Sequence, residues 1–97
     1  MFLESHDAEA GNSLCCAAYR IDYEYQAEQW VIDQANEPHH HIVRAVLFSE
    51  GGDPFVEWAR ATPDGDFAKV PVTPGTKADP RTVQRAAEKR REDGLAS

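Results

Sequence analysis

Three consecutive histidines, His39-His40-His41, are the residues of this chain that most suggest metal chemistry. On a β-strand His39 and His41 share a face, and a His-x-His pair can supply two ligands of a zinc site. Such a site needs further ligands, and only Glu37 is near in the sequence. We therefore interpret the histidines as the polar entrance to a strand. We name His39 and His41 as the residues that a metal would use, and we expect no metal or other cofactor.

Two adjacent cysteines, Cys15 and Cys16, could form a reactive thiol pair. The surrounding residues 14–18 are apolar, and no lysine or histidine lies beside the thiols to lower their pKa. A bridge between neighbours would also close almost no loop and would constrain little of the unfolded chain. We expect buried, inert cysteines, as in a protein of a reducing compartment.

Carboxylates follow one another through the first half of the chain. If Asp22 and Glu24 lie on one strand face, they are about 6.8 Å apart, two strand rises. Glu28, Asp33 and Glu37 extend the series, which could imitate the phosphates of DNA or form an ordinary solvated face. Two carboxylates at this spacing do not indicate a glycosidase, because nothing in the sequence predicts a substrate cleft around them.

Basic residues form a stripe near the C-terminus, where Arg81, Arg85 and Lys89 are spaced four apart, as on one face of a helix. Arg85 and Lys89 each have an acid three residues further on, whereas Arg81 has no such partner and stands at the positive end of the helix dipole. The stripe could bind an external anionic partner or dock on the protein's own acidic residues. We favour the second interpretation.

Charge divides the chain in two. The formal net charge is −7; residues 1–66 hold thirteen acids against three arginines, and residues 67–97 hold seven bases against four acids. An acidic body repels nucleic acid over most of its surface but leaves one cationic element. Because no nucleophile elbow, phosphate loop or nucleic-acid-binding signature accompanies these charges, we expect a protein that is not an enzyme.

The length of 97 residues suits one domain. No run approaches the roughly 18 apolar residues that span a bilayer, so we expect no membrane association. Acids follow the first three residues closely, unlike in a signal peptide. With the adjacent cysteines, this predicts a cytoplasmic protein.

A strictly alternating stretch, residues 19–26, predicts the first element that must hold these side chains. Apolar residues at every second position are typical of a strand with one buried and one solvated face. The apolar positions are Tyr19, Ile21, Tyr23 and Tyr25. We predict a strand over residues 14–26, preceded by a flexible N-terminal arm over residues 1–13. Tyr19, Ile21, Tyr23 and Trp30 should form one buried cluster.

The pattern then changes period. Residues 27–36 carry apolar positions at helical spacing and predict a helix, although a strand over 29–33 remains an alternative. Residues 39–49 predict a buried strand, because their middle is apolar and β-branched. Residues 55–62 predict the next strand, with a short helix over 55–61 as the alternative.

The last third of the chain holds a turn, a strand and a helix. Pro63-Asp64-Gly65 indicates the turn, and residues 67–72 predict an edge strand because Pro71 lacks a backbone donor. Asp79-Pro80 is typical of a helix start, so we predict a C-terminal helix over about residues 80–93 that Gly94 stops. Residues 95–97 should be a frayed tail.

The sequence therefore predicts a small single α+β domain over residues 14–94, of order β-α-β-β-β-α, with an antiparallel meander and a C-terminal helix. We expect a small acidic protein-binding module, an inhibitor or adaptor that occludes a basic surface of a partner. The expected contact residues are Asp22, Glu24, Glu28, Asp33, Arg81 and Arg85.

In size and charge alone the chain is similar to phage-encoded anti-defence inhibitors, including anti-CRISPR proteins, and to toxin-immunity proteins. Either class would act in host defence by binding a protein partner. The alternative is a small nucleic-acid-binding regulator that uses the basic C-terminal helix, but we do not expect direct nucleic-acid binding.

Overall fold

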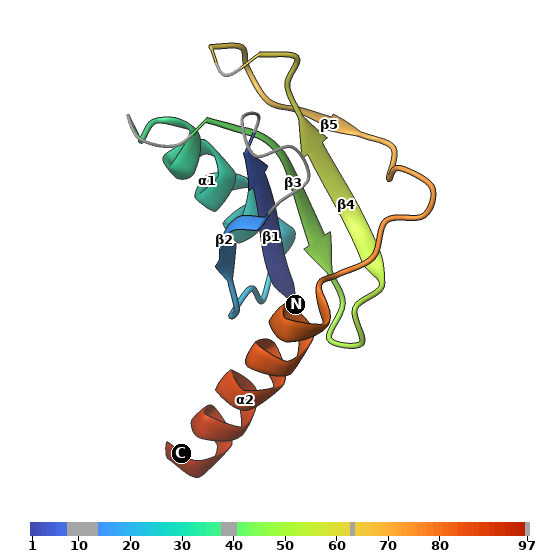
Figure 1. The fold of residues 1–97 in the computed structure, drawn as a ribbon. Coiled ribbons are helices and arrows are strands. Elements are labelled where there is room, and N and C mark those ends of the chain that lie inside the picture. The colour runs from blue at the N-terminus through green and yellow to red at the C-terminus, as the bar shows by residue number, and fades with distance from the viewer. Residues whose placement is uncertain (8–13, 38–40, 63, 97) are drawn as a thin grey trace.

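The computed structural model describes residues 1–7, 14–37, 41–62 and 64–96 as a five-stranded antiparallel sheet with two helices (Figure 1). The elements are β1 (Phe2–Asp7), β2 (Leu14–Ala18), α1 (Glu24–Ala35), β3 (Ile42–Phe48), β4 (Pro54–Ala59), β5 (Ala68–Val70) and α2 (Pro80–Ala96). The strand order is β2-β1-β3-β4-β5, so β3, β4 and β5 form the expected meander. The predicted α+β class with a C-terminal helix is confirmed.

The N-terminal segment is a strand in the middle of the sheet, so the prediction of a flexible arm is wrong for β1. It pairs with β2 on one side and with β3 on the other. Phe2, Leu3, Glu4 and Ser5 are all at most 1% exposed, because both faces of the strand are covered. Because Glu4 and Ser5 are polar, the sequence pattern did not indicate a strand here. Residues 8–13 of the expected arm lie outside the described residues.

The alternating stretch is not a strand, which corrects the prediction for residues 19–26. β2 ends at Ala18, and α1 begins at Glu24 after the N-cap residue Tyr23. The Gln26 side chain, at the third helical position, accepts the backbone N–H of Tyr23 at 3.0 Å. This hydrogen bond is the reciprocal half of a capping box, which stabilises the first turn of a helix. The alternation of apolar residues does not reveal it.

Helix α1 therefore starts three residues before the predicted helix, and the strand alternative for residues 29–33 is wrong. Ile21 is buried as expected, whereas Tyr23 is 61% exposed and does not belong to the core. Trp30 packs partly buried against the core beneath α1, and Tyr19 packs against a second cluster. The expected single cluster is thus divided between two places.

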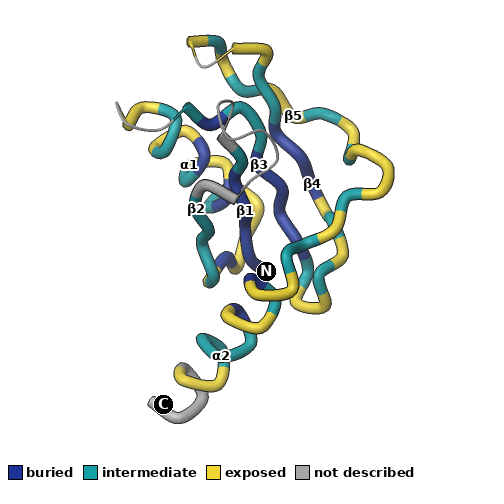
Figure 2. The backbone as a smooth tube through the Cα atoms, in the orientation of Figure 1, coloured by how far each residue is buried: buried dark blue, intermediate teal, exposed yellow. Residues whose placement is uncertain are grey.

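Helix α1 covers one face of the sheet and closes the larger core. Ala27 and Val31 are its buried residues, and they belong to the same core as alternate residues of β1, β3 and β4. Figure 2 shows buried backbone on α1 and along these strands. The buried members of this core are Leu3, Ile21, Ala27, Val31, Ala45, Leu47, Val56 and Trp58. This core holds α1 in a fixed orientation, so the opposite side of the helix is left to solvent.

The other face of the sheet carries a smaller core under the start of α2. The rings of Phe2 and Phe48 stack with centroids 5.4 Å apart, and Val46 and Ala86 join them. Asp79 begins the helix as predicted, because its carboxylate accepts the backbone N–H of Arg81 at 2.8 Å. From there α2 runs away from the sheet (Figure 1). Neither described helix has the length and apolar character that crossing a bilayer requires.

The predicted stop at Gly94 is wrong, since α2 continues through that residue to Ala96. A glycine costs a helix only about 1 kcal/mol relative to alanine, so it weakens a last turn without ending it. The expected frayed tail is accordingly helical up to Ala96, and Ser97 lies outside the described residues.

The meander confirms the strand predictions after α1. β3 is shorter at both ends than the strand predicted over residues 39–49, and β4 begins one residue before and ends three residues before the strand predicted over residues 55–62. The helix alternative for residues 55–61 is wrong. The expected turn is present, because the Gly65 N–H donates to the Thr62 carbonyl at 3.0 Å. Arg60 fastens this loop, as its Nε donates to the Ile42 carbonyl and its guanidinium lies over the Phe67 ring. β5 is an edge strand, as predicted, but it covers only Ala68–Val70, so the predicted strand over residues 67–72 is too long at both ends and Pro71 lies after it.

We expect Ile21→Ala to lower the free energy of unfolding by about 2–5 kcal/mol, because it leaves a cavity in the core beneath α1. Tyr23→Ala should change it by less than about 0.5 kcal/mol, as is usual for surface substitutions. Urea denaturation of the two variants measures both values. Equal losses would contradict the placement of residues 19–23 as a loop with one buried anchor.

Candidate functional site

The four acidic residues expected at a protein contact lie on α1 and just before it. Asp22, Glu24, Glu28 and Asp33 are all exposed. Asp22 and Glu24 do not share a strand face as expected, because the chain between them enters the helix. The buried side of α1 faces the sheet, so the helix presents its carboxylates to solvent.

Three large apolar side chains accompany these carboxylates in solvent. Tyr23 and Tyr25 are 61% and 69% exposed, and their rings stack with centroids 5.7 Å apart. Ile32, which is 43% exposed, follows Tyr25 by seven residues, two turns, and so shares its side of α1. We call Asp22, Tyr23, Glu24, Tyr25, Glu28, Ile32 and Asp33 the α1 outer face.

This grouping is unusual for a surface helix, which normally keeps its large apolar residues toward the core. Single exposed apolar residues need no explanation, but a stacked aromatic pair among carboxylates marks a candidate interaction surface. The sequence reasoning assigned both tyrosines to a buried strand face. The signal that could have placed them correctly is Gln26, the capping residue of α1.

Two of the acids on the α1 outer face are engaged within the protein. Glu24 forms an exposed ion pair with Lys69 of β5 at 3.0 Å, and Asp33 accepts a hydrogen bond from the Gln29 amide at 3.0 Å. Asp22 and Glu28 form no ion pair with any described residue. The surface therefore keeps uncompensated negative charge beside the tyrosines.

Arg81 has a partner, which corrects the expectation that it has none. Its Nη2 lies 2.9 Å from Asp79 Oδ2, and its Nε donates to Asp79 Oδ1 at 3.2 Å. Hydrogen bonds from the Arg81 side chain and backbone hold the pKa of the Asp79 carboxyl below its usual value. The helix cap thus also neutralises the cation that had looked unpaired.

The remaining basic residues of the stripe pair as the sequence predicted. Arg85 lies 4.0 Å from Glu88, and Lys89 lies 3.6 Å from Glu92. A further ion pair joins Arg90 on α2 to Glu50 in the turn after β3, at 3.8 Å. The positive charge of α2 is therefore largely compensated by acids of the same chain.

The structure describes only part of the histidine and cysteine clusters. His39 lies outside the described residues, and His41 is half-buried immediately before β3. No group of three potential metal ligands occurs among the described side chains. Cys16 is half-buried, and its Sγ lies 2.9 Å from Ser5 Oγ. It is thus less buried than expected.

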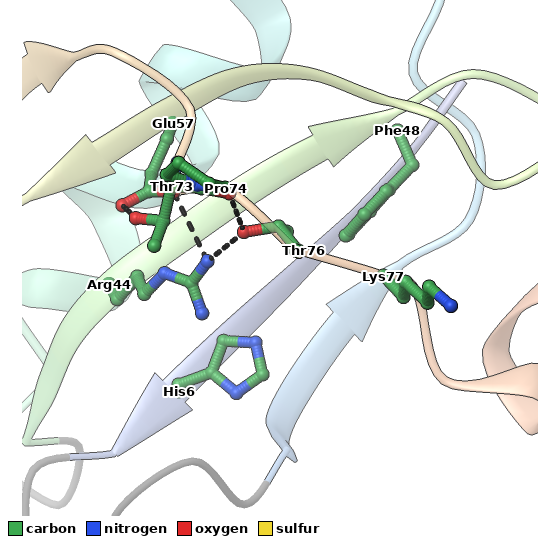
Figure 3. Close-up of a pocket in the computed structure, with 9 residues that line it drawn as sticks. His6, Arg44, Phe48, Glu57, Thr73, Pro74, Thr76 and Lys77 are labelled. Atoms are coloured by element: carbon green, nitrogen blue, oxygen red, sulfur yellow. Dashed lines mark hydrogen bonds and ion pairs between the residues drawn. The ribbon is translucent and has the colours of Figure 1, made fainter.

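A second polar cluster, which the sequence reasoning missed, lies on the sheet face opposite α1 (Figure 3). Glu57 is only 4% exposed, and its Oε1 accepts hydrogen bonds from Arg44 Nη2 and from the backbone N–H of Thr73, both at 3.1 Å. Its Oε2 accepts the Thr73 hydroxyl at 3.0 Å. Arg44 Nη2 also donates to Thr76 Oγ1 at 2.7 Å. We call Arg44, Glu57, Thr73 and Thr76 the polar cluster.

A tight turn delivers the two threonines to this cluster. The Thr76 N–H donates to the Thr73 carbonyl at 3.2 Å, with Pro74 and Gly75 between them. Gly75 has a φ of +83°, so the turn has the type II pattern of Pro followed by a left-handed Gly. The segment of residues 73–76 is thereby joined to the sheet by hydrogen bonds to the buried carboxylate of Glu57.

The environment of Glu57 sets its protonation. Burial by itself raises the pKa of this carboxyl, but hydrogen bonds from Arg44 and Thr73 outweigh it and hold the pKa below its ordinary value of 4.5. Glu57 is therefore ionised at neutral pH, paired with Arg44.

Comparisons with protein-family models, with curated proteins and with solved structures found no match to this chain. Its function must therefore be argued from its own residues.

We expect Glu57→Gln to lower the free energy of unfolding by about 1–3 kcal/mol at pH 7, because an amide cannot accept all three hydrogen bonds. A lowered folded-state pKa stabilises the protein above the unfolded-state pKa, and this contribution is lost as the pH falls through the folded-state value. The difference between wild type and variant should therefore be constant near neutrality and shrink below pH 4.5. Urea titrations across this range measure it.

The exposed Glu28→Gln serves as the matched control and should show a small difference at every pH. A Glu57→Gln difference that stays constant into the acid range would contradict the assignment of a lowered pKa.

Proposed function

We propose that this chain is a small, non-enzymatic, cytoplasmic protein-binding module whose α1 outer face docks on a basic surface of a protein partner. It would act as an inhibitor or adaptor by covering that surface. The observation that carries the proposal is the exposed, stacked pair of Tyr23 and Tyr25 among uncompensated carboxylates.

Tyrosine is enriched at protein interfaces, because its ring supplies a large contact area while losing few rotatable bonds. The faces of Tyr23 and Tyr25 are also suited to arginine or lysine side chains of a partner, which are attracted to aromatic rings. Asp22 and Glu28 would then accept hydrogen bonds from the same cations. Aromatic rings and carboxylates in one place thus favour a basic protein surface over an apolar one.

Long-range charge supports the same choice of partner. Residues 1–66 hold thirteen acids against three arginines, so the potential over the body of the molecule steers it toward basic surfaces. A basic surface of this kind is typical of nucleic-acid-binding proteins. An inhibitor that covers one is the mode of action that a phage anti-defence or anti-CRISPR-like protein of this size and charge would use.

Helix α2 supports protein binding more than nucleic-acid binding. Arg81 and Arg85, which the sequence proposed as contact residues, both form ion pairs within α2 or its cap. Phosphates would have to compete with those carboxylates while approaching an acidic molecule. We therefore leave Arg81 and Arg85 out of the proposed contact, because the start of α2 packs on the sheet face opposite α1.

We expect the double charge reversal Asp22→Lys with Glu28→Lys to slow association with the partner by about tenfold or more at low salt, because electrostatic steering accounts for one to three decades in rate. The effect should diminish at about 0.5 M salt, where charges are screened. The partner is first isolated by affinity purification from lysate, and the rates are measured by stopped flow or surface plasmon resonance.

Asp64→Lys with Asp66→Lys is the matched control, because it changes the net charge equally at exposed residues of another loop. Equal slowing by the two double variants would reduce the proposal to a general charge effect. An unchanged rate in both would show that the α1 outer face is not the contact.

We further expect no binding of DNA or RNA tighter than about 1 μM at physiological salt, since non-specific affinities of ordinary nucleic-acid-binding proteins lie between about 10⁻⁴ and 10⁻⁶ M. A gel-shift titration at two salt concentrations measures this. Tight, salt-sensitive binding that Arg81→Ala with Arg85→Ala weakens, with a salt slope smaller by about two units, would instead establish the nucleic-acid alternative.

A further inference from the structure

A hollow of about 470 Å³ opens beside the polar cluster, on the sheet face that α1 does not cover. Its lining consists of His6 on β1, Arg44 and Phe48 on β3, Glu57 on β4, and residues 73–77 (Figure 3). Its volume falls within the roughly 300–1,000 Å³ of small-molecule sites. It is also separate from the α1 outer face, because Arg44 and its neighbour Ala45 point to opposite faces of the sheet.

The acceptors of the polar cluster are engaged inside the protein. Both oxygens of Glu57 accept hydrogen bonds, from Arg44 and from Thr73. The Thr76 hydroxyl accepts from Arg44 and donates to the Thr73 carbonyl. The carboxylate that could repel an anion is therefore already neutralised by its partners.

Donors, in contrast, are left over. All the hydrogen bonds that Arg44 makes to described residues leave from Nη2, so Nη1 and Nε are not engaged by them. Figure 3 shows the other amino group of Arg44 directed toward the side of the hollow where His6 lies. Lys77 stands exposed at the rim, without an ion-pair partner among the described residues. The hollow thus offers donors and positive charge within an otherwise acidic molecule.

We propose that this hollow binds a small molecule through a carboxylate or phosphate group, held by Arg44 and by Lys77. Arginine suits such a group because its planar guanidinium matches oxyanion geometry, and Lys77 adds a second, movable charge. The structure anchors Arg44 in place through Glu57 and Thr76, so the donor is fixed before a ligand arrives, which lowers the entropic cost of binding. The exposed Pro74 offers an apolar contact for the rest of the ligand, and the buried Phe48 lies behind it in the lining.

Macromolecular polyanions do not fit this site. The positive charge is confined to two side chains in a hollow, and the surrounding chain has a net charge of −7. A long polyanion would bring further negative charge against the acidic body, whereas a small molecule places one anionic group at the donors.

The test is a titration of ¹⁵N-labelled full-length protein with acetate and, separately, with inorganic phosphate, at constant ionic strength set by sodium chloride. We expect saturable shifts of the Gly75, Thr76 and Lys77 amides, with a Kd on the order of 1 mM for so small a probe. Saturation by acetate alone, by phosphate alone or by both supports the proposal and shows whether the site accepts carboxylates, phosphates or either. Saturation by neither probe at about fifty times that concentration would overturn the proposal.

Lys77→Gln should weaken binding by about two- to fivefold, the effect of losing one solvated charge contact. Lys69→Gln is the matched control, because Lys69 is an exposed lysine that pairs with Glu24 away from the hollow. If both variants bind the probe as tightly as the wild type, Lys77 has no role in binding. If both bind it more weakly by the same factor, the effect is one of general charge. Both substitutions are at exposed residues, so folding is not at risk.

Discussion

The hydrogen bond from the Asp79 backbone N–H to Glu4 joins the start of α2 to the N-terminal strand β1, and much of the structure depends on it. Glu4 is 1% exposed on the interior strand β1, and its Oε1 accepts that N–H at 2.9 Å. A buried carboxylate without partners costs several kcal/mol, so the segment before α2 must cross the sheet where Glu4 can be reached. This fixes the start of α2 above Phe2 and Phe48, and it fixes the course of residues 73–78, which complete the polar cluster.

The two faces of the sheet follow different principles. The face beneath α1 is closed by apolar packing, so every charged residue of α1 is left to point into solvent. The opposite face is only partly covered by apolar residues, and over the rest of it one buried carboxylate organises Arg44 and the turn at Pro74–Gly75. A buried ion pair of this kind adds little net stability compared with an apolar core. What the ion pair does instead is to fix the direction of the Arg44 guanidinium, which apolar packing could not orient.

The sequence predicted those elements whose signals are local: the helix after residue 26, the meander, and the start of α2 at Asp79-Pro80. It did not predict β1, because Glu4 and Ser5 look like surface residues until the covering segments are known. The alternation of residues 19–26 misled for a related reason, since a short loop followed by a helix start can imitate a period of two. The polar cluster could not have been found, because Arg44 and Glu57 meet only through the register of β3 and β4. In the same way, the sequence indicated which acids belong to the candidate contact. It did not indicate that they lie beside the exposed Tyr23 and Tyr25, because that arrangement depends on where α1 begins.

The α1 outer face and the hollow lie on opposite sides of strand β3, and neither has to influence the other. Ala45 packs under α1 while Arg44, its neighbour on β3, lines the hollow, so the two surfaces lie on opposite sides of the sheet and share no residue. Coupling between them would require an element with two alternative arrangements, and a sheet strand paired on both sides is poorly suited to that role. Binding at the two surfaces should therefore contribute additively to the stability of the folded chain, as independent ligands of one native state do. The division of the sheet into an apolar face and a polar face is thus what allows so small a protein to present two chemically different surfaces.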